Sequence, residues 1–352
     1  MSDRNEAKPG SQARRDFLKV TGVAAAGLVA SGLTANAAGT MPPLPNNPVT
    51  PTAMPTRNLG KTGYRVGIFC LGGQAAVEKP NNEAIAVPIV EKALDLGINY
   101  IDTAAAYGGE ERWSQRYIGQ VMKRRRNETW LSTKTHDRTR DGSLKLLEQS
   151  LKLLNTDHLD LWQLHNISRM EQVEQIFGEG GAIEAVQQAR EQKMVRFIGV
   201  TGHADPEVLM EMIRRFPFDT ILMALNAADQ HQLSFREKLL PMAVEKQMGI
   251  IGMKLPARGR ILSTWTPPPL DHQTGFEGKA DRPGTITIKD AMYYTLSLPV
   301  STVIIGCDSI AQLEENVRLA REFTPLSEAQ QAALSEKTTP IARQALFFRK
   351  WS

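Results

Sequence analysis

The sequence predicts an α/β fold in which a (β/α)8 TIM barrel follows an N-terminal β-hairpin. Three observations support this prediction. Short apolar runs typical of buried strands alternate with helical patterns, which indicates repeated βα units and a parallel sheet. Eight such runs occur, which is the number of strands that closes a barrel of this type. The Gly-rich GxGxxG turn that is typical of an open dinucleotide-binding sheet is absent.

In chain order the hairpin comes first. Arg57–Gly60 and Gly63–Val66 flank a turn at Lys61-Thr62, and we expect them to cap the bottom of the barrel. The strands are expected at Ile68–Leu71, Ile98–Ile101, Trp130–Thr133, Leu159–Leu164, Phe197–Val200, Thr220–Leu225, Ile250–Met253 and Thr302–Ile305. Helices between them are expected, among others, at Glu83–Leu96, Ser143–Leu154, Ala182–Gln192, Pro206–Arg215, Phe235–Gln247 and Ile310–Glu322. A long loop rich in Pro, Gly and Asp, Arg258 to Thr285, interrupts the pattern, and loops of this length are usually functional.

The first 37 residues have the features of a twin-arginine signal peptide. The pair Arg14-Arg15 precedes a charge-free run, Val20–Leu33, and Ala35-Asn36-Ala37 offers a small-x-small cleavage site. The run is short and Gly-rich for a membrane span. We therefore expect a leader at 1–37, a Pro-rich linker at 38–55 and the barrel at 56–352. The leader predicts folded export to the periplasm by the twin-arginine machinery; the alternative is a disordered basic tail.

Charge and cysteine content exclude several classes of protein. The formal net charge is +4, of which the leader carries +2, so a nucleic-acid-binding surface is not expected. The basic run Lys123-Arg124-Arg125-Arg126 is interpreted as the solvated end of a helix. Cys70 and Cys307 each lie in or beside an apolar run and are expected to be buried free thiols. Neither the cysteines nor the histidines show the spacing of a metal site, so none is expected.

Ionisable side chains follow three successive strand runs. Asp102 comes directly after Ile98–Ile101, and Tyr107 lies five residues later in a Gly-containing loop. Lys134 and His165 end the next two runs in the same way. The carboxyl ends of the strands in a parallel barrel meet at one face, where catalytic residues gather. The sequence therefore predicts that these four side chains form one site.

From about Thr56 to Phe323 the chain resembles the aldo-keto reductase family. The stretches that carry the resemblance are Asn99-Tyr-Ile-Asp-Thr-Ala-Ala-Ala-Tyr-Gly108, Leu131-Ser-Thr-Lys-Thr135, Asp160-Leu-Trp-Gln-Leu-His165, Ile304-Ile-Gly306 and Gln312-Leu-Glu-Glu-Asn316. The resemblance implies a (β/α)8 barrel, a nicotinamide dinucleotide bound across the C-terminal rim, and a catalytic tetrad of Asp102, Tyr107, Lys134 and His165.

Carbonyl reduction needs a hydride on carbon and a proton on oxygen, and Tyr107 is the expected proton donor. A free tyrosine has a pKa of about 10, so we expect the Lys134 ammonium, held by Asp102, to lower the pKa of Tyr107. His165 is expected to orient the carbonyl oxygen or to assist proton transfer. Taken singly, each residue has a structural alternative as a loop cap, a packing group, a solvated cation or a hydrogen-bonded strand end.

The nicotinamide contacts of the family map onto this chain with changes. A Ser-Asn pair falls on Thr201-Gly202 and a Gln falls on Leu222, which leaves Thr201 and suggests Asn226 as a substitute. An aromatic residue that stacks on the nicotinamide falls on Met253, whose thioether can pack against a ring.

The phosphate and adenine contacts are expected near the last strand and in the long loop. Gly306 and Gln312 occupy positions where some branches carry basic residues for the 2′-phosphate, while Glu315 and Asn316 match the adenine-side pattern. Lys254 and Arg258 are candidate phosphate partners, with ordinary surface cations as the alternative. NADP is the expected cofactor and NAD is possible.

These features predict an NAD(P)H-dependent oxidoreductase that reduces an aldehyde or ketone, its partner being a small-molecule carbonyl substrate. The alternative is an exported nicotinamide-binding redox sensor or regulatory subunit with little turnover, which the altered nicotinamide contacts favour. The sequence leaves the substrate and the oligomeric state open.

Overall fold

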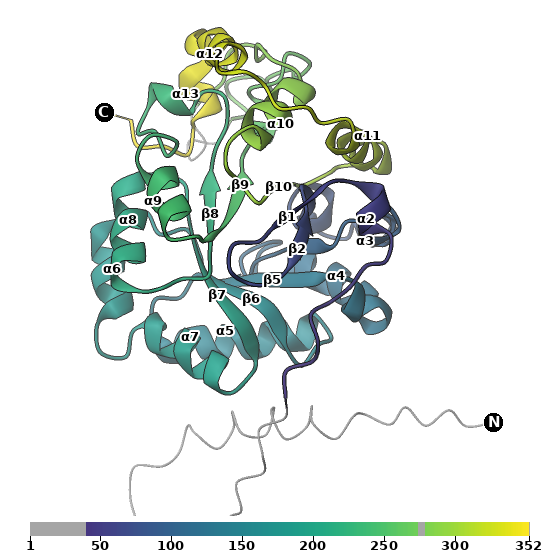
Figure 1. Ribbon diagram of the computed structural model, residues 1–352, viewed down its shortest axis with the longest axis vertical. Coiled ribbons are helices and arrows are strands. Elements are labelled where there is room, and N and C mark those ends of the chain that lie inside the picture. Colours follow the sequence, from purple (N-terminus) through teal and green to yellow (C-terminus); the bar gives the residue numbers. More distant parts are fainter. Residues whose placement is uncertain (1–39, 274–278, 352) are drawn as a thin grey trace, which may run out of the picture.

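The computed structural model describes residues 40–273 and 279–351. The expected leader, residues 1–37, lies outside the described residues. The described chain folds into a closed barrel of eight parallel strands with helices around it (Figure 1). The predicted α/β barrel is therefore confirmed.

All eight predicted strands are present, and each pairs in parallel with its neighbours. They are β3 (Phe69–Gly72), β4 (Tyr100–Asp102), β5 (Trp130–Thr135), β6 (Leu159–Leu164), β7 (Val195–Gly202), β8 (Thr220–Ala224), β9 (Gly249–Met253) and β10 (Thr302–Ile305). Pairing of β10 with β3, Val303 opposite Phe69, closes the barrel. Because side chains alternate along a strand, each strand sends one set inward and the other toward the helices. The inward set includes Tyr100, Trp130 and Leu222.

The helices of the βα units cover the outside of the barrel, and the last two belong to the C-terminal segment. They are α3 (Glu83–Asp95), α4 (Trp113–Arg125), α5 (Arg140–Leu153), α6 (Met170–Phe177), α7 (Ala182–Glu191), α8 (Pro206–Arg215), α9 (Leu239–Glu245), α10 (Ile288–Leu296), α11 (Ile310–Arg321), α12 (Glu328–Lys337) and α13 (Ala342–Ala345). Helix α5 begins earlier than expected because Thr139 caps it, accepting from the Gly142 amide at 3.2 Å. Helix α9 begins later than Phe235, because Asp229 accepts the Ser234 hydroxyl at 2.7 Å and holds that segment as a turn.

The hairpin at the bottom of the barrel is also confirmed. Strands β1 (Thr56–Asn58) and β2 (Arg65–Gly67) pair antiparallel. Leu59 and Tyr64 belong to the same buried cluster as the inward-facing residues. The Tyr64 hydroxyl donates to the Asn99 carbonyl at 2.7 Å, just before β4. The amino ends of the strands are thus sealed, which leaves their carboxyl ends for a site.

Residues 40–55, expected as part of a linker, lie against this sealed end. The Asn46 amide donates to the Asn127 carbonyl at 2.8 Å, and the Asn47 side chain donates to the Leu94 carbonyl at 2.8 Å. A short helix, α2 (Thr50–Ala53), buries Ala53. The described part of this segment is therefore packed onto the barrel.

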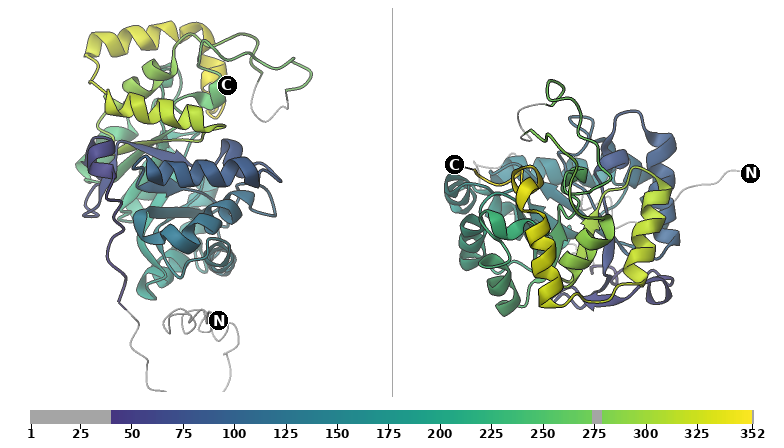
Figure 2. Two further views of the ribbon diagram at one scale, coloured as in Figure 1. Left: turned by 90° about the vertical axis from the view of Figure 1, so that its right-hand side faces the viewer. Right: turned by 90° about the horizontal axis from the view of Figure 1, so that it is seen from above.

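The C-terminal segment lies at the other end of the barrel. Helices α12 and α13 sit near α10 (Figures 1 and 2), and the described parts of the 258–285 loop extend outward there. Arg349 reaches the strand ends, donating to the Ala224 carbonyl at 3.1 Å and forming a buried ion pair with Asp229 at 2.5 Å. No helix in the two described ranges is long and apolar enough to span a membrane.

Candidate active site

The fold brings the four predicted catalytic residues to one end of the barrel. Asp102 is the last residue of β4, and it lies opposite Ser132 of β5. Lys134 lies near the end of β5 opposite Gln163, and His165 directly follows β6. Tyr107 lies in the loop after β4. The parallel register therefore places all four at the carboxyl ends of neighbouring strands.

Asp102 and Lys134 form a fully buried ion pair. Each side chain is 1% exposed, and the Lys134 ammonium also donates to the Thr103 carbonyl at 2.7 Å. The second carboxylate oxygen of Asp102 accepts from the Gln163 amide at 3.1 Å. Burial lowers the pKa of Lys134, and the Asp102 carboxylate opposes this change. A buried pair is stable only when its remaining groups are hydrogen-bonded, as they are here.

Tyr107 lies between this pair and His165. Its ring centre is 4.9 Å from the Lys134 ammonium nitrogen, and 5.7 Å from the His165 ring centre in an edge-on arrangement. The ammonium thus sits over the ring of the tyrosine. The expected lowering of the tyrosine pKa is wrong: burial raises the pKa of Tyr107 well above 10, and the charges of Asp102 and Glu78 add to this. The phenol therefore keeps its proton at neutral pH in the absence of a ligand.

His165 is held as a neutral imidazole. Burial lowers its pKa well below 6.5, and the positive charge of Lys134 lowers it further. Its backbone amide donates to the Thr135 carbonyl at 2.8 Å, and its own carbonyl accepts from Arg138 at 2.7 Å. A neutral imidazole can donate one hydrogen bond to a carbonyl oxygen without adding a charge.

A cavity of about 690 Å³ opens beside these residues. Asp102 and Tyr107 line it, and so do seven of the predicted cofactor contacts: Met253, Lys254, Arg258, Gly306, Gln312, Glu315 and Asn316. The lining runs from the end of β4 across β3, β9 and β10 to helix α11. Its volume and elongated lining suit a large cofactor.

The remaining two predicted cofactor contacts do not line this cavity. The Thr201 hydroxyl is buried and accepts from the Asn166 amide at 2.8 Å. Asn226 is fully buried; its amide donates to the Ala345 carbonyl at 3.1 Å and its oxygen accepts from the Ala228 amide at 2.9 Å. Leu222, at the position of the family Gln, lies inside the barrel.

The residues present in the cavity fit an anionic dinucleotide. A Cβ at Gly306 would lie 3.0 Å from the Gln74 backbone, so this glycine allows two chain segments to meet at the cavity wall. Helix α11 begins beside the wall and directs its positive end there. Burial lowers the pKa of Lys254 to about 8, and the charge of Arg258 contributes. A bound phosphate would offset the repulsion between Lys254 and Arg258.

The sequence interpretation missed several residues of this region. Gln163, which binds Asp102, was detectable as a polar residue in an apolar strand run, two positions before His165. His203 follows β7 as His165 follows β6, and its Nδ1 lies 2.9 Å from the Asn166 side-chain oxygen. Gln74 binds the Lys254 ammonium at 3.1 Å across the cavity, a contact between residues 180 positions apart that local patterns do not reveal.

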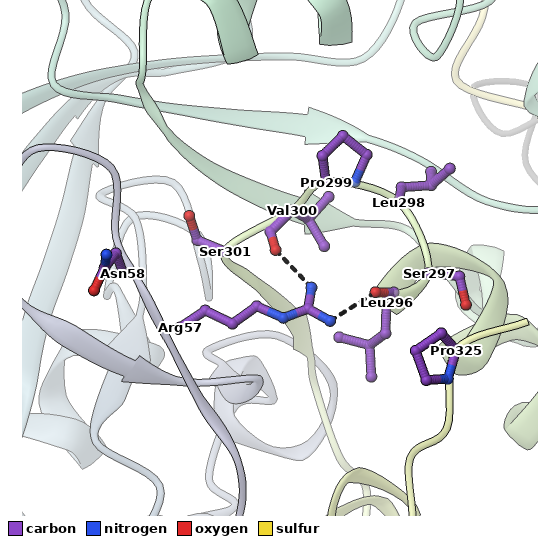
Figure 3. Close-up of a pocket in the computed structure, with 9 residues that line it drawn as sticks. All are labelled: Arg57, Asn58, Leu296, Ser297, Leu298, Pro299, Val300, Ser301 and Pro325. Atoms are coloured by element: carbon purple, nitrogen blue, oxygen red, sulfur yellow. Dashed lines mark hydrogen bonds between the residues drawn. The ribbon is translucent and has the colours of Figure 1, made fainter.

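A second hollow, of about 520 Å³, lies beside the hairpin (Figure 3). Arg57 is the one ionisable residue of its lining, and its guanidinium donates to the carbonyls of Val300 at 2.7 Å and Leu296 at 2.9 Å (Figure 3). These bonds tie the hairpin to the end of helix α10. This hollow therefore offers packing rather than acid–base chemistry.

The two predicted free cysteines are confirmed as buried and unpaired by a disulfide. Within the described residues, no group of three or more His, Cys, Asp or Glu side chains is placed to hold a metal ion.

Comparison with known proteins gives a consistent result. The profile of the Aldo/keto reductase family matches residues 66–276. L-galactose dehydrogenase of Arabidopsis thaliana is 29% identical over 307 residues, covering 81% of this chain and 93% of that protein. The holo form of aldo-keto reductase AKR11C1 from Bacillus halodurans superposes with a TM-score of 0.65 at 26% identity, covering 81% of this chain and 96% of that one. An aldo-keto reductase of Schizosaccharomyces pombe named with NADP(+) is 30% identical over 164 residues, 42% of this chain and 46% of that protein.

Proposed function

Since the chain belongs to the aldo/keto reductase family and is an oxidoreductase of that family, we propose that it reduces an aldehyde or ketone to an alcohol with NADPH. The observation that carries this proposal is the position of Tyr107. Its ring lies beside the Lys134 ammonium and His165, and the same residue lines the large cavity. A proton donor and a cofactor-sized space thus meet at one place.

Each residue has a defined task in this proposal. A bound nicotinamide dinucleotide supplies the hydride for the carbonyl carbon. His165, neutral at physiological pH, donates a hydrogen bond to the carbonyl oxygen and orients it. Tyr107 transfers its hydroxyl proton to that oxygen as negative charge develops there. The Lys134 ammonium stabilises the phenolate that remains, and Asp102 holds the ammonium in place.

NADP is the proposed cofactor, with NAD as a weaker alternative. Lys254 and Arg258 would hold phosphate groups, Met253 would pack on the nicotinamide, and Gln312, Glu315 and Asn316 would surround the adenosine end. The relative named with NADP(+) supports this preference. Thr201 would act from outside the cavity, and Asn226 would have to give up its bond to Ala345.

Folded export by the twin-arginine route is also proposed. The Arg14-Arg15 pair, the charge-free run and the small-x-small site that follow one another in the sequence support this proposal. Replacing Arg14 and Arg15 by lysine should leave unprocessed protein in the cytoplasm; normal processing of that double variant would exclude the route.

A second candidate function is a nicotinamide-binding redox sensor with little turnover. The observation that favours it is the absence of Thr201 and Asn226 from the residues that line the cavity. NADPH oxidation, followed by absorbance with a panel of aldehydes, separates the two functions. Tyr107→Phe should abolish turnover and leave NADPH binding, measured by fluorescence, largely intact.

Tyr64→Phe is the matched control, because it removes the same hydroxyl at the sealed end of the barrel. It should keep its turnover. Near-native turnover of Tyr107→Phe would contradict the reductase mechanism. Tight NADPH binding by the native protein without turnover of any aldehyde would favour the sensor.

A further inference from the structure

Basic side chains surround His165 on the side of the barrel mouth formed by β5, β6 and β7. The side chains of this basic half-site are His136, Arg138, His165, Arg169 and His203. None of them lines the large cavity, which lies over β3, β9 and β10. The basic half-site is therefore separate from the cations of the dinucleotide cavity, Lys254 and Arg258 among them, and binding of the cofactor does not account for it.

Arg138 has an incomplete set of hydrogen bonds. Its Nη2 donates to the carbonyls of His165 at 2.7 Å and Asn166 at 3.2 Å. Its Nε and Nη1 are buried and have no hydrogen-bond partner within the described residues. An unpaired buried polar group costs about 1–3 kcal/mol, and more when it is charged. Such a cost is usually offset by a water molecule, an ion or a ligand.

The neighbouring acid, Asp137, favours the charged form of Arg138 but makes no hydrogen bond to it. One carboxylate oxygen of Asp137 accepts from the Thr139 amide at 2.8 Å and from its hydroxyl at 2.7 Å. The other oxygen, Oδ2, lies so close to Gly142 that a Cβ added to this glycine would be only 2.2 Å from it. Asp137 is thus held against the start of helix α5, and its effect on the pKa of Arg138 is opposed by the positive charge of Arg169.

Positive charges also act on the histidines of the basic half-site. Arg112 and Arg138 add to burial in lowering the pKa of His136, and the Asp137 carboxylate opposes them. Positive charge likewise adds to burial in lowering the pKa of His203, where Lys254, Arg349 and Lys134 contribute. A bound anion would relieve this repulsion.

We infer that the substrate carries a carboxylate in addition to its carbonyl, and that Arg138 recognises this carboxylate while the carbonyl lies between Tyr107 and His165. This inference rests on the proposed reductase function. The contact between Arg138 and the His165 carbonyl places the guanidinium next to the residue that orients the reacting oxygen. Arginine binds carboxylates through short charge-assisted hydrogen bonds. An oxo acid or a formyl-substituted acid has the required chemistry.

The test compares two aldehydes that differ in one charge, 4-carboxybenzaldehyde and methyl 4-formylbenzoate. With NADPH, the native enzyme should show a kcat/KM at least about tenfold higher for the acid, mainly through KM. Arg138→Met should lose roughly 10- to 100-fold in kcat/KM for the acid, the effect of one charged hydrogen bond, and little for the ester. Arg138→Lys, which keeps the charge, should recover part of the loss.

Arg140→Met is the matched control, since Arg140 is an exposed cation two residues away that pairs with Asp141 at 2.8 Å. It should leave the preference for the acid unchanged.

Equal kcat/KM for the two aldehydes in the native enzyme would overturn the inference. An equal loss of kcat/KM on both aldehydes in Arg138→Met would also overturn it, because Arg138 would then only position His165. In both cases the reductase function would stand. Failure to reduce either aldehyde or any in the wider panel would instead overturn the reductase function, and this inference with it.

Discussion

The barrel holds an ion pair with a buried carboxylate near each of its ends, and the two pairs differ in their surroundings. Near the sealed end, Arg126 binds Asp160 at 2.8 Å; it also donates to the Thr129 carbonyl at 2.9 Å, and Asp160 accepts from the Leu131 amide at 2.9 Å. At the mouth, the Lys134–Asp102 pair faces the ring of Tyr107 and the large cavity.

This difference shows how one kind of interaction can serve two purposes. The bonds of Arg126 go to backbone carbonyls, to the Thr156 hydroxyl and to Asp160, so its charge joins the starts of neighbouring strands. Lys134 lies within 4.9 Å of the centre of a tyrosine ring and lowers the pKa of His165. Arg126 also lowers the pKa of a titratable neighbour, His158, so the difference lies in access: of the two pairs, only Lys134–Asp102 borders the large cavity, where a charge beside titratable side chains can prepare a reaction.

The largest expected effect is on turnover, from the pair at the mouth. Lys134→Met removes the ammonium that stabilises the phenolate of Tyr107. The kcat for aldehyde reduction should fall by about 10²- to 10⁴-fold, the usual contribution of acid–base catalysis. Steady-state NADPH oxidation measures this, with NADPH fluorescence as a check that the cofactor still binds. A kcat within a few-fold of native would assign Lys134 a structural role like that of Arg126.

The pair at the sealed end should show the opposite behaviour. Arg126→Met leaves the buried Asp160 carboxylate with only Arg196, whose Nε lies 3.6 Å away, as a cation, so the free energy of unfolding should fall by up to about 3 kcal/mol, as measured by urea denaturation. The kcat of the folded enzyme should stay near native. Arg124→Met, on the same helix end, removes only an exposed ion pair to Glu91 and should cost less than about 1 kcal/mol. A large loss of kcat in folded Arg126→Met would show that the two ends are coupled.

The sequence predicted those parts of the structure that depend on local pattern. Alternating apolar runs located all eight strands, and the strand ends located Asp102, Lys134 and His165. Features that depend on distant contacts were not predictable. Asn226 meets Ala345 through a bond between residues 119 positions apart, so its availability depends on how the C-terminal segment folds back.

The direction of the Tyr107 pKa shift was missed for a related reason. Sequence spacing placed a cation near the phenol, but the outcome depends on the balance of burial, Asp102 and Glu78 against positive charge. That balance is a property of the folded mouth. Similarly, Arg138 gave no sequence signal, since its bonds to the His165 and Asn166 carbonyls, and the lack of partners for its other nitrogens among the described residues, are properties of the folded mouth.

The smallest expected effect is on the affinity for the cofactor. Here a lysine of the cavity is compared with a lysine at the sealed end. Because burial and Arg258 lower the pKa of Lys254 to about 8, its side chain is charged below pH 8 and loses its proton as the pH rises through this value. If Lys254 binds the 2′-phosphate, NADPH affinity should be constant from about pH 7 to 7.5 and should weaken above pH 8, whereas NADH affinity should change little. Lys254→Ala should weaken NADPH binding at pH 7 by roughly 1.5–3 kcal/mol and remove this pH dependence.

The control is Lys61→Ala, in the exposed hairpin turn, which should change neither the NADPH affinity nor its pH dependence. Fluorescence titration of both reduced cofactors measures all of these quantities. Equal weakening of NADPH and NADH would place Lys254 at the phosphates that the two cofactors share, and an unchanged NADPH affinity would remove it from the phosphate site.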